Sequence, residues 1–263
     1  MIRGVIIALV LTVSAGIAAA DTSTPQPQAT TDNTAGGNHW RFVPSKHHGA
    51  VHVWVPHNYD PATAGVVIYI HGFYTNVDKS WNERGLAEQF AASKRNAMFI
   101  ACEAPSWGEG HVNWSSPNNL ITSALEATKV QRPLGDVIVL GHSGAHRTFR
   151  RWLSYRSINH IILLDAMYGH TRRYMWWLGQ NKSHAENRVT IVAQDTLAWA
   201  EPLWHRRKDM VALDQIPSSV EEIPKAKRNA RLLYMRSQHS HMALVLSRKV
   251  IPMLLQLTRL QPL

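Results

Sequence analysis

Short apolar runs rich in β-branched residues recur along the chain, and longer segments with helical periodicity lie between most of them. The runs predict strands at Ala50–Val55, Val66–Ile70, Ala97–Ala101, Val137–Leu140, His160–Leu164, Val189–Val192 and Arg231–Met235. The periodic segments predict helices at Asn82–Arg95, Asn118–Val130, Ala145–Tyr155, Tyr174–Asn187, Ser218–Arg228 and Met242–Leu260. This alternation predicts an α/β fold whose mainly parallel sheet has about eight strands and helices on both faces. The first strand alternates more than the others, so we expect it at an edge.

The N-terminal residues have the three-part pattern of a secretory signal peptide. Arg3 supplies a positive start, residues 4–17 are almost entirely apolar, and Ala18-Ala19-Ala20 offers small residues before Asp21. The alternative is a transmembrane anchor, but the apolar stretch is shorter than the ~20 residues that a spanning helix needs. We therefore expect a signal peptide over residues 1–20, a secreted or periplasmic protein, and no stable membrane span after cleavage.

Composition divides the remaining chain into a linker and one domain. Residues 21–38 are rich in Thr, Pro, Gln and Gly and lack aromatic and branched aliphatic residues, which predicts a flexible linker. Residues 39–263 are long enough for a single domain with a sizeable core. Cys102 is the only cysteine, which excludes an intrachain disulfide, and its position at the end of an apolar run predicts a buried structural thiol.

The net charge is +10, or +9 once Arg3 leaves with the signal peptide, which favours an anionic envelope surface as a partner. The sequence has no zinc-finger spacing or RNA-binding signature, so we expect no nucleic-acid partner. The histidines lack the paired spacing of a zinc site, and we expect neither a metal nor a cofactor.

The run Gly141-His142-Ser143-Gly144-Ala145 joins a predicted strand to a predicted helix. A nucleophile elbow has this context, and its sharp turn requires small residues around the serine because larger ones would clash. The alternative is an ordinary glycine-rich turn. The strand-to-helix context favours Ser143 as a nucleophile.

A second motif, His71-Gly72-Phe73-Tyr74, follows the strand at Val66–Ile70. With the elbow two strands later, the sequence resembles the α/β-hydrolase superfamily, in its serine esterase and lipase-like branch. The resemblance extends in element order over roughly residues 40–260, but only the motifs are specific. It implies that the amides of Phe73 and Gly144 form an oxyanion hole, and that His71 braces the loop instead of acting as the base.

In this superfamily the base is a histidine between the last strand and the last helix. His239 and His241 both lie there, and we favour His241 because it directly precedes the predicted helix at Met242. The acid also has two candidates, each following a strand. Asp195 occupies the commoner position in the superfamily, whereas Asp165 lies at the end of a more buried strand, where a charge needs a partner. We favour Asp165 slightly, and either aspartate has a structural alternative as a helix or turn cap.

Aromatic residues near the strand ends are candidates for substrate binding: Tyr74, Trp107 on the loop Glu103–Asn119, and Trp176. Tyr174–Leu178 either overhangs the pocket or belongs to a helix packed on the sheet, and any lid is small. Together these features predict hydrolysis of a small-molecule or polymer ester through an acyl-enzyme. The alternatives are an amidase or peptidase with the same triad, and a non-catalytic protein that binds anionic envelope polymers.

Overall fold

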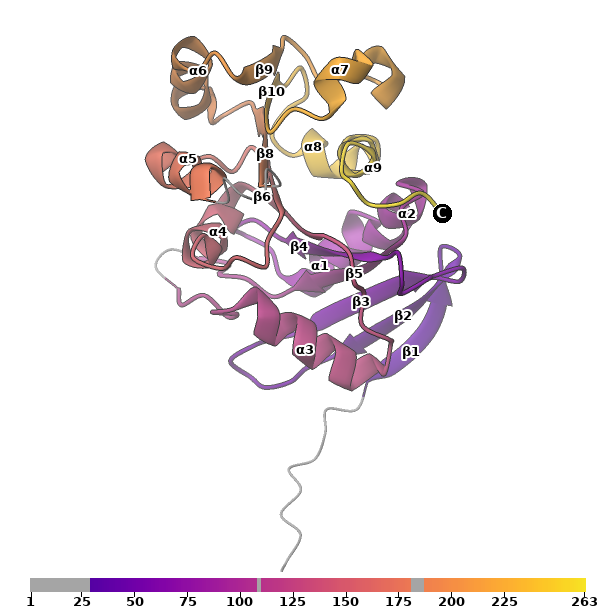
Figure 1. Cartoon of the computed structure of the whole chain (residues 1–263). Coiled ribbons are helices and arrows are strands. Elements are labelled where there is room, and N and C mark those ends of the chain that lie inside the picture. The colour runs from indigo at the N-terminus through magenta and orange to yellow at the C-terminus, as the bar shows by residue number, and fades with distance from the viewer. Residues whose placement is uncertain (1–28, 108–109, 181–186) are drawn as a thin grey trace, which may run out of the picture.

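The computed structural model describes residues 29–107, 110–180 and 187–263, and Figure 1 shows their arrangement. The predicted signal peptide and the first residues of the predicted linker lie outside this part of the chain. The described strands are β1 (Thr30–Thr34), β2 (Gly37–Phe42), β3 (Val51–Pro56), β4 (Gly65–Ile70), β5 (Ala97–Cys102), β6 (Val137–His142), β7 (His160–Leu164), β8 (Arg188–Ala193), β9 (Met210–Leu213) and β10 (Leu232–Arg236). They form one sheet in the order β1-β2-β3-β5-β4-β6-β7-β8-β10-β9.

The fold class predicted from the sequence is confirmed, and all seven predicted strands are present. From β5 to β9 every neighbouring pair is parallel, whereas β1, β2 and β3 pair in antiparallel fashion. The prediction that the first apolar run forms an edge strand is wrong. The strand β3 lies between β2 and β5, and all six of its residues are buried because its side chains enter the hydrophobic layers on both faces of the sheet.

Three strands were not predicted, and one of them lies in the expected linker. Residues 30–34 form β1, whose side chains are mostly exposed and whose order comes from backbone pairing with β2. Backbone pairing does not require apolar side chains, so composition carried no signal for this strand. The expected linker therefore ends before Thr30.

The helices differ from the prediction mainly in being shorter. Their bounds are α1 (Val77–Glu83), α2 (Leu86–Ala92), α3 (Pro117–Thr128), α4 (His146–Trp152), α5 (Thr171–Gln180), α6 (Leu197–Arg206), α7 (Lys225–Arg228), α8 (Ala243–Leu246) and α9 (Val250–Gln256), with 3₁₀ turns at Ser143–Ala145 and Val220–Glu222. The helix expected over residues 82–95 is interrupted at Gly85, whose φ of 57° is left-handed. The segment expected as one helix over residues 242–260 is likewise divided into α8 and α9.

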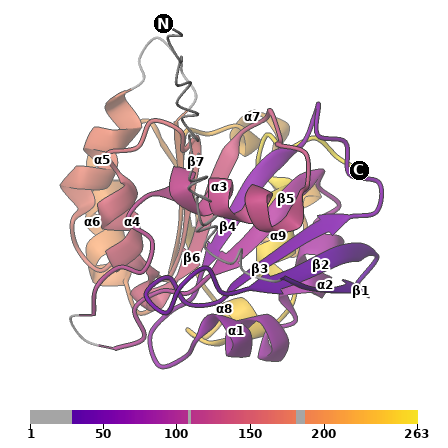
Figure 2. The ribbon, with the colours of Figure 1, turned by 90° about the horizontal axis from the view of Figure 1, so that it is seen from below.

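Two hydrophobic layers cover the sheet. One contains side chains from α3, α4, α5 and α6, including Phe149 and Trp152, and the other contains side chains from α1, α2, α8 and α9, including Phe90 and Ile251. Figure 2 shows α5 and α6 on one side of the strands and α9 on the other. The helix α5 buries Tyr174 and Trp177, so this part of residues 170–188 packs on the sheet. Cys102 is buried at the end of β5 and has a free thiol.

The parallel strands place their carboxyl ends along a single edge of the sheet. In such folds ligands bind at this edge, because the loops that follow neighbouring strands meet there. Ser143 follows β6, Asp165 follows β7, and His241 lies five residues after β10. No helix within the described residues has both the length and the apolar character needed to cross a membrane.

Candidate active site

Ser143 occupies a strained turn between β6 and α4. Its φ is 53°, in the left-handed region that non-glycine residues rarely adopt. The neighbouring residues must be small. A Cβ on Gly144 would lie 2.4 Å from the ring of Phe73, and one on Gly141 would lie 2.6 Å from Cβ of Ala145. The strain and the tight packing are those of a nucleophile elbow, which raises the serine above the sheet.

His241 and Asp165 form a close pair beside this turn. Nδ1 of His241 lies 2.6 Å from Oδ2 of Asp165, whose side chain is fully buried. The carboxylate also accepts hydrogen bonds from the amides of Gln194, Asp195 and Thr196 and from the Thr196 hydroxyl. Burial alone raises the pKa of Asp165, but these hydrogen bonds together outweigh burial and hold it well below its usual value. Asp165 is therefore a fixed anion that orients the imidazole.

The structure places the two alternative residues less favourably. Oδ2 of Asp195 lies 3.5 Å from Nδ1 of His241, and its side chain is 56% exposed. Its own backbone amide supports Asp165. His239 makes backbone hydrogen bonds with Ser237, and its imidazole forms no hydrogen bond with any residue of the described ranges. The geometry therefore brings Asp165 and His241 together and leaves Asp195 and His239 beside them.

The loop after β4 lies against the elbow. A Cβ on Gly72 would approach Cβ of Ser143 to 3.0 Å, so only glycine permits this close approach without displacement. The amide of Phe73 donates no hydrogen bond to any described residue, whereas the next amide, that of Tyr74, donates to the carbonyl of Ser106 at 2.9 Å. A free donor at the Phe73 amide, beside Gly144, is what an oxyanion hole requires.

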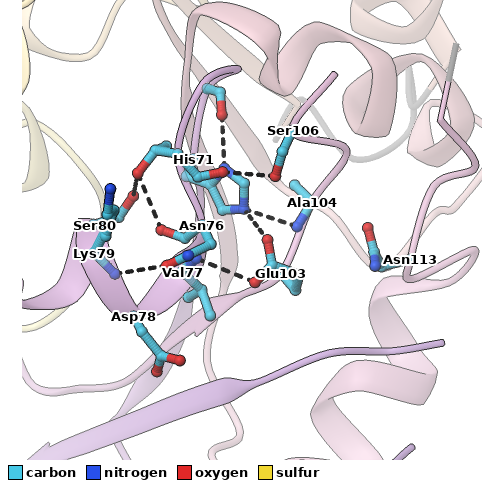
Figure 3. Close-up of polar contacts among 12 residues, drawn as sticks. His71, Asn76, Val77, Asp78, Lys79, Ser80, Glu103, Ala104, Ser106 and Asn113 are labelled. Atoms are coloured by element: carbon cyan, nitrogen blue, oxygen red, sulfur yellow. Dashed lines mark hydrogen bonds and ion pairs between the residues drawn. The ribbon is translucent and has the colours of Figure 1, made fainter. Parts of the chain in front are cut away.

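His71 and Glu103 brace this loop from below, as Figure 3 shows. Nδ1 of His71 donates to the carbonyl of Gly72 at 2.7 Å, and Nε2 lies 2.7 Å from Oε1 of Glu103. The other carboxylate oxygen of Glu103 accepts a hydrogen bond of 3.2 Å from the amide of Val77, the first residue of α1. One carboxylate from the end of β5 therefore holds both ends of the segment that carries Phe73.

Tyr168 is a site residue to which the sequence analysis gave no role. It lines the same cleft as Ser143, and burial raises its pKa. No hydrogen bond joins Ser143 to His241 within the described ranges, and such contacts are often loose in ligand-free enzymes. A tyrosine three residues after a strand-end aspartate has no sequence signature, because the path of the loop after β7 decides which of its side chains line the cleft.

Comparisons with known proteins bear on the fold of this chain. No protein-family profile matches the sequence, and no curated protein matches it. Solved structures do match. A feruloyl esterase module from Clostridium thermocellum is 12% identical, with a TM-score of 0.58 over 88% of this chain and 93% of that one. An S-formylglutathione hydrolase from Agrobacterium tumefaciens is also 12% identical, with a TM-score of 0.51 over 87% and 96%. A fluorophosphonate-binding serine hydrolase of Staphylococcus aureus is 10% identical, with a TM-score of 0.50 over 87% and 97%.

This protein has the α/β-hydrolase fold. At these identities the similarity establishes the fold alone, and the residues of the site must carry any statement about chemistry.

The site opens into a cleft of about 760 Å³. Ser143, Gly144 and His241 line it together with apolar and charged side chains. The other described lining residues are Phe73, Tyr74, Thr75, Lys79, Glu83, Arg84, His142, His146, Tyr168, Met242 and Leu246. A cleft of this size and mixed character accommodates a small organic ligand or part of a polymer.

Two further histidines, His142 and His146, line the cleft. His142 is almost fully buried and its Nε2 donates to the carbonyl of His241 at 3.0 Å. Burial, and then the neighbouring His241, lower the pKa of His142 to about 3. Burial also lowers the pKa of His146. His142 is therefore neutral, and its hydrogen bond fixes the backbone that carries the base.

The aromatic residues predicted to bind substrate do not all reach the cleft. Tyr74 lines the cleft and is 75% exposed, and Trp107 packs against it with ring centroids 4.7 Å apart. Trp176 is exposed on α5 and is not among the described residues that line the cleft. The helical periodicity of α5 places Trp176 on the solvent side, opposite the buried Tyr174 and Trp177.

Asp165, Asp195 and His241 each offer a ligand atom within 4.8 Å of the others, a spacing compatible with a metal ion. The oxygens of Asp165, however, already accept five hydrogen bonds, from amides, a hydroxyl and the imidazole. A carboxylate so fully engaged is arranged to orient a histidine, and we assign this cluster to a candidate triad with Ser143.

Proposed function

We propose that this protein is an exported serine hydrolase that cleaves carboxylic esters through an acyl-enzyme on Ser143. The observation that carries the proposal is the strained Ser143 in one cleft with a histidine that is fixed by a buried carboxylate. The structures of similar fold include proteins described as an esterase and as a fluorophosphonate-binding serine hydrolase, which supports this class of chemistry by analogy of fold.

In the first half-reaction His241 acts as the base. Because Nδ1 is held by Asp165, Nε2 is the nitrogen that accepts the proton as Oγ of Ser143 attacks the ester carbonyl. Asp165 stabilises the imidazolium that results. The negative charge that develops on the carbonyl oxygen is received by the amides of Phe73 and Gly144. The imidazolium then protonates the departing alcohol, and the acyl group remains on Ser143.

The second half-reaction repeats these roles with water. His241 removes a proton from a water molecule as this molecule attacks the acyl carbonyl, and the same two amides hold the oxyanion. Collapse of the intermediate breaks the bond to Oγ, which regains its proton from the imidazolium. The carboxylic acid leaves, and Ser143 returns to its starting state.

The test compares the wild-type protein with Ser143→Ala on p-nitrophenyl butyrate and with a fluorophosphonate probe. We expect hydrolysis and labelling in the wild type, with the label on Ser143 by peptide mass spectrometry, and neither in the variant. Ser218→Ala, an exposed serine far from the elbow in sequence, is the control and should behave like the wild type. Equal hydrolysis in the wild type and Ser143→Ala would refute the proposal.

Export rests on the first twenty residues alone and has a separate test. Expression in a bacterium with a Sec pathway should yield protein in the periplasm or medium that begins at Asp21, as measured by intact-mass spectrometry. Cytoplasmic protein that retains Arg3 would contradict this part of the proposal and leave the hydrolytic part standing.

A further inference from the structure

A second cavity, of about 670 Å³, lies beside the elbow helix. Four of its seven described lining residues are arginines, and Ser154 and Tyr155 add two hydroxyls. The full set is Val112, Arg147, Arg150, Arg151, Ser154, Tyr155 and Arg173, which we call the arginine groove. Each polar side chain in this set is able to donate hydrogen bonds, and none is a carboxylate.

The arrangement follows from the pattern of α4. Arg147, Arg150, Arg151 and Ser154 are spaced as i, i+3, i+4 and i+7, so they follow one face of the helix, while Phe149 and Trp152 on the opposite face enter the core. Arg173 approaches from α5. The two helices therefore place their guanidinium groups around the same cavity.

These charges are not balanced by acidic neighbours in the part of the chain that the structure describes. None of the four guanidinium groups forms an ion pair with a carboxylate of the described ranges. Nε of Arg150 is buried and has no hydrogen-bond partner there. Like charges held close together repel one another, and a buried donor without an acceptor is unfavourable. An anion bound in the groove supplies both the negative charge and the hydrogen-bond acceptor that these arginines lack.

The arginine groove adjoins the catalytic cleft at Arg147. The guanidinium of Arg147 lies 5.0 Å from the ring centroid of Phe73, which lines the cleft and whose amide we assign to the oxyanion hole. His146, the residue before Arg147 in α4, also lines the cleft. A substrate that reaches past Phe73 toward α4 therefore meets the arginines.

We propose that the arginine groove is a subsite for an oxyanion carried by the substrate itself, a carboxylate or a phosphate, so that the hydrolase acts on anionic esters. The inference rests on the proposed hydrolytic function and narrows its substrate class. Arginine suits this role because its planar fork donates two parallel hydrogen bonds to a carboxylate or phosphate.

The test measures charge preference at constant chain length. The p-nitrophenyl monoesters of adipic, suberic and sebacic acid are compared with p-nitrophenyl hexanoate, octanoate and decanoate, whose acyl chains are equally long but uncharged. We expect kcat/KM to favour the charged ester at one or more lengths, and added sodium chloride to reduce the preference by screening. A ratio near one at every length would overturn the proposal.

Three single substitutions test whether the arginine groove causes the preference for charged esters. Arg151→Gln and Arg173→Gln should each lower the ratio of charged over neutral kcat/KM about tenfold, as expected for the loss of one charge-assisted contact. The neutral esters should be cleaved as before. Arg132→Gln removes the same charge from an exposed site before β6, at the other end of the strand from Ser143, and should leave the ratio unchanged. An equal effect of all three would indicate general attraction by net charge and would overturn the subsite.

A binding measurement separates this inference from the hydrolytic proposal and from a site for free anions. Suberate and inorganic phosphate are titrated calorimetrically into Ser143→Ala and into Ser143→Ala/Arg151→Gln. Suberate binding that Arg151→Gln weakens supports the groove even if no ester is cleaved, and absence of suberate binding overturns it. Phosphate binding without suberate binding or a charged-ester preference would indicate a site for inorganic anions and would also overturn the proposal.

Discussion

Nδ1 of His241 lies 2.6 Å from Oδ2 of Asp165, although 76 positions separate the two residues in the chain. The contact exists because β7 and β10 lie on either side of β8 and end at the same edge of the sheet. The first prediction concerns this pair. Asp165→Asn should lower kcat for p-nitrophenyl butyrate by about 10⁴-fold, because an amide no longer fixes the imidazole tautomer or stabilises its cation.

The matched control for this prediction is Asp195→Asn. Asp195 is mostly exposed and lies 3.5 Å from the same nitrogen, and its backbone amide, which supports Asp165, is unchanged by the substitution. We expect less than about a tenfold loss of kcat, in line with the small energies of exposed ion pairs. A larger loss in Asp195→Asn than in Asp165→Asn would reverse the assignment of the acid.

The second prediction concerns the packing of the oxyanion loop against the elbow. Gly144→Ala places a Cβ 2.4 Å from the ring of Phe73, so the ring must move and the backbone amide of Phe73 must move with it. Displacement of one oxyanion donor should lower kcat by about 10²–10³-fold. Gly179→Ala on α5 is the same substitution in open space, and its kcat should equal that of the wild type. Wild-type activity in Gly144→Ala would show that the Phe73 amide has no part in the reaction.

The third prediction treats Glu103 as a positioning residue. Glu103→Ala removes the acceptor for both His71 and the Val77 amide, so the loop that carries Phe73 loses its brace. We expect kcat to fall by about 10–100-fold while KM changes little, because the lost interaction orients a donor used in the transition state.

Glu103→Gln provides the discriminating control. Its amide oxygen still accepts a hydrogen bond in this position, so we expect partial recovery of kcat. A purely structural role for Glu103 would instead lower the melting temperature and the fraction of active protein, with unchanged kcat per active site as titrated by the fluorophosphonate. That outcome would contradict the positioning role.

The fourth prediction is a loss of stability on mild acidification. Burial lowers the pKa of His142 to about 3 and that of His160 well below its usual value. Because the unfolded chain binds these protons near the ordinary pKa of 6.5, the unfolded state takes up more protons below that pH. The free energy of unfolding is therefore highest above pH 6.5 and decreases as the pH falls. Each such histidine lowers it by about 2 kcal/mol at pH 5.

Urea unfolding followed by tryptophan fluorescence between pH 7 and pH 5 measures this dependence. His160→Gln removes one of the buried histidines, so the free energy of unfolding should change less with pH in this variant. His57→Gln, at an exposed position, should show the same pH dependence as the wild type. A free energy of unfolding that is constant across this range in the wild type would contradict the prediction.

Local sequence determined much of this protein. The apolar runs specified the seven central strands, because a strand buried on both faces must be continuously apolar. The spacing of Gly141, Ser143 and Gly144 specified the elbow, because a turn this tight permits only small neighbours. Helix bounds were less well determined. Periodicity continues across Gly85 and across the break between α8 and α9, whereas the backbone there turns to follow the sheet.

Tertiary structure alone decided the remaining features. The outer strand β1 is ordered by backbone pairing, which leaves no apolar signature in its sequence. The choice of Asp165 over Asp195, the place of Tyr168 in the cleft with Ser143, the brace from Glu103 and the convergence of Arg173 with α4 all depend on residues from different elements. A sequence pattern records which face of an element is buried. Distances between side chains on different elements are set only when the sheet assembles and its loops meet at one edge.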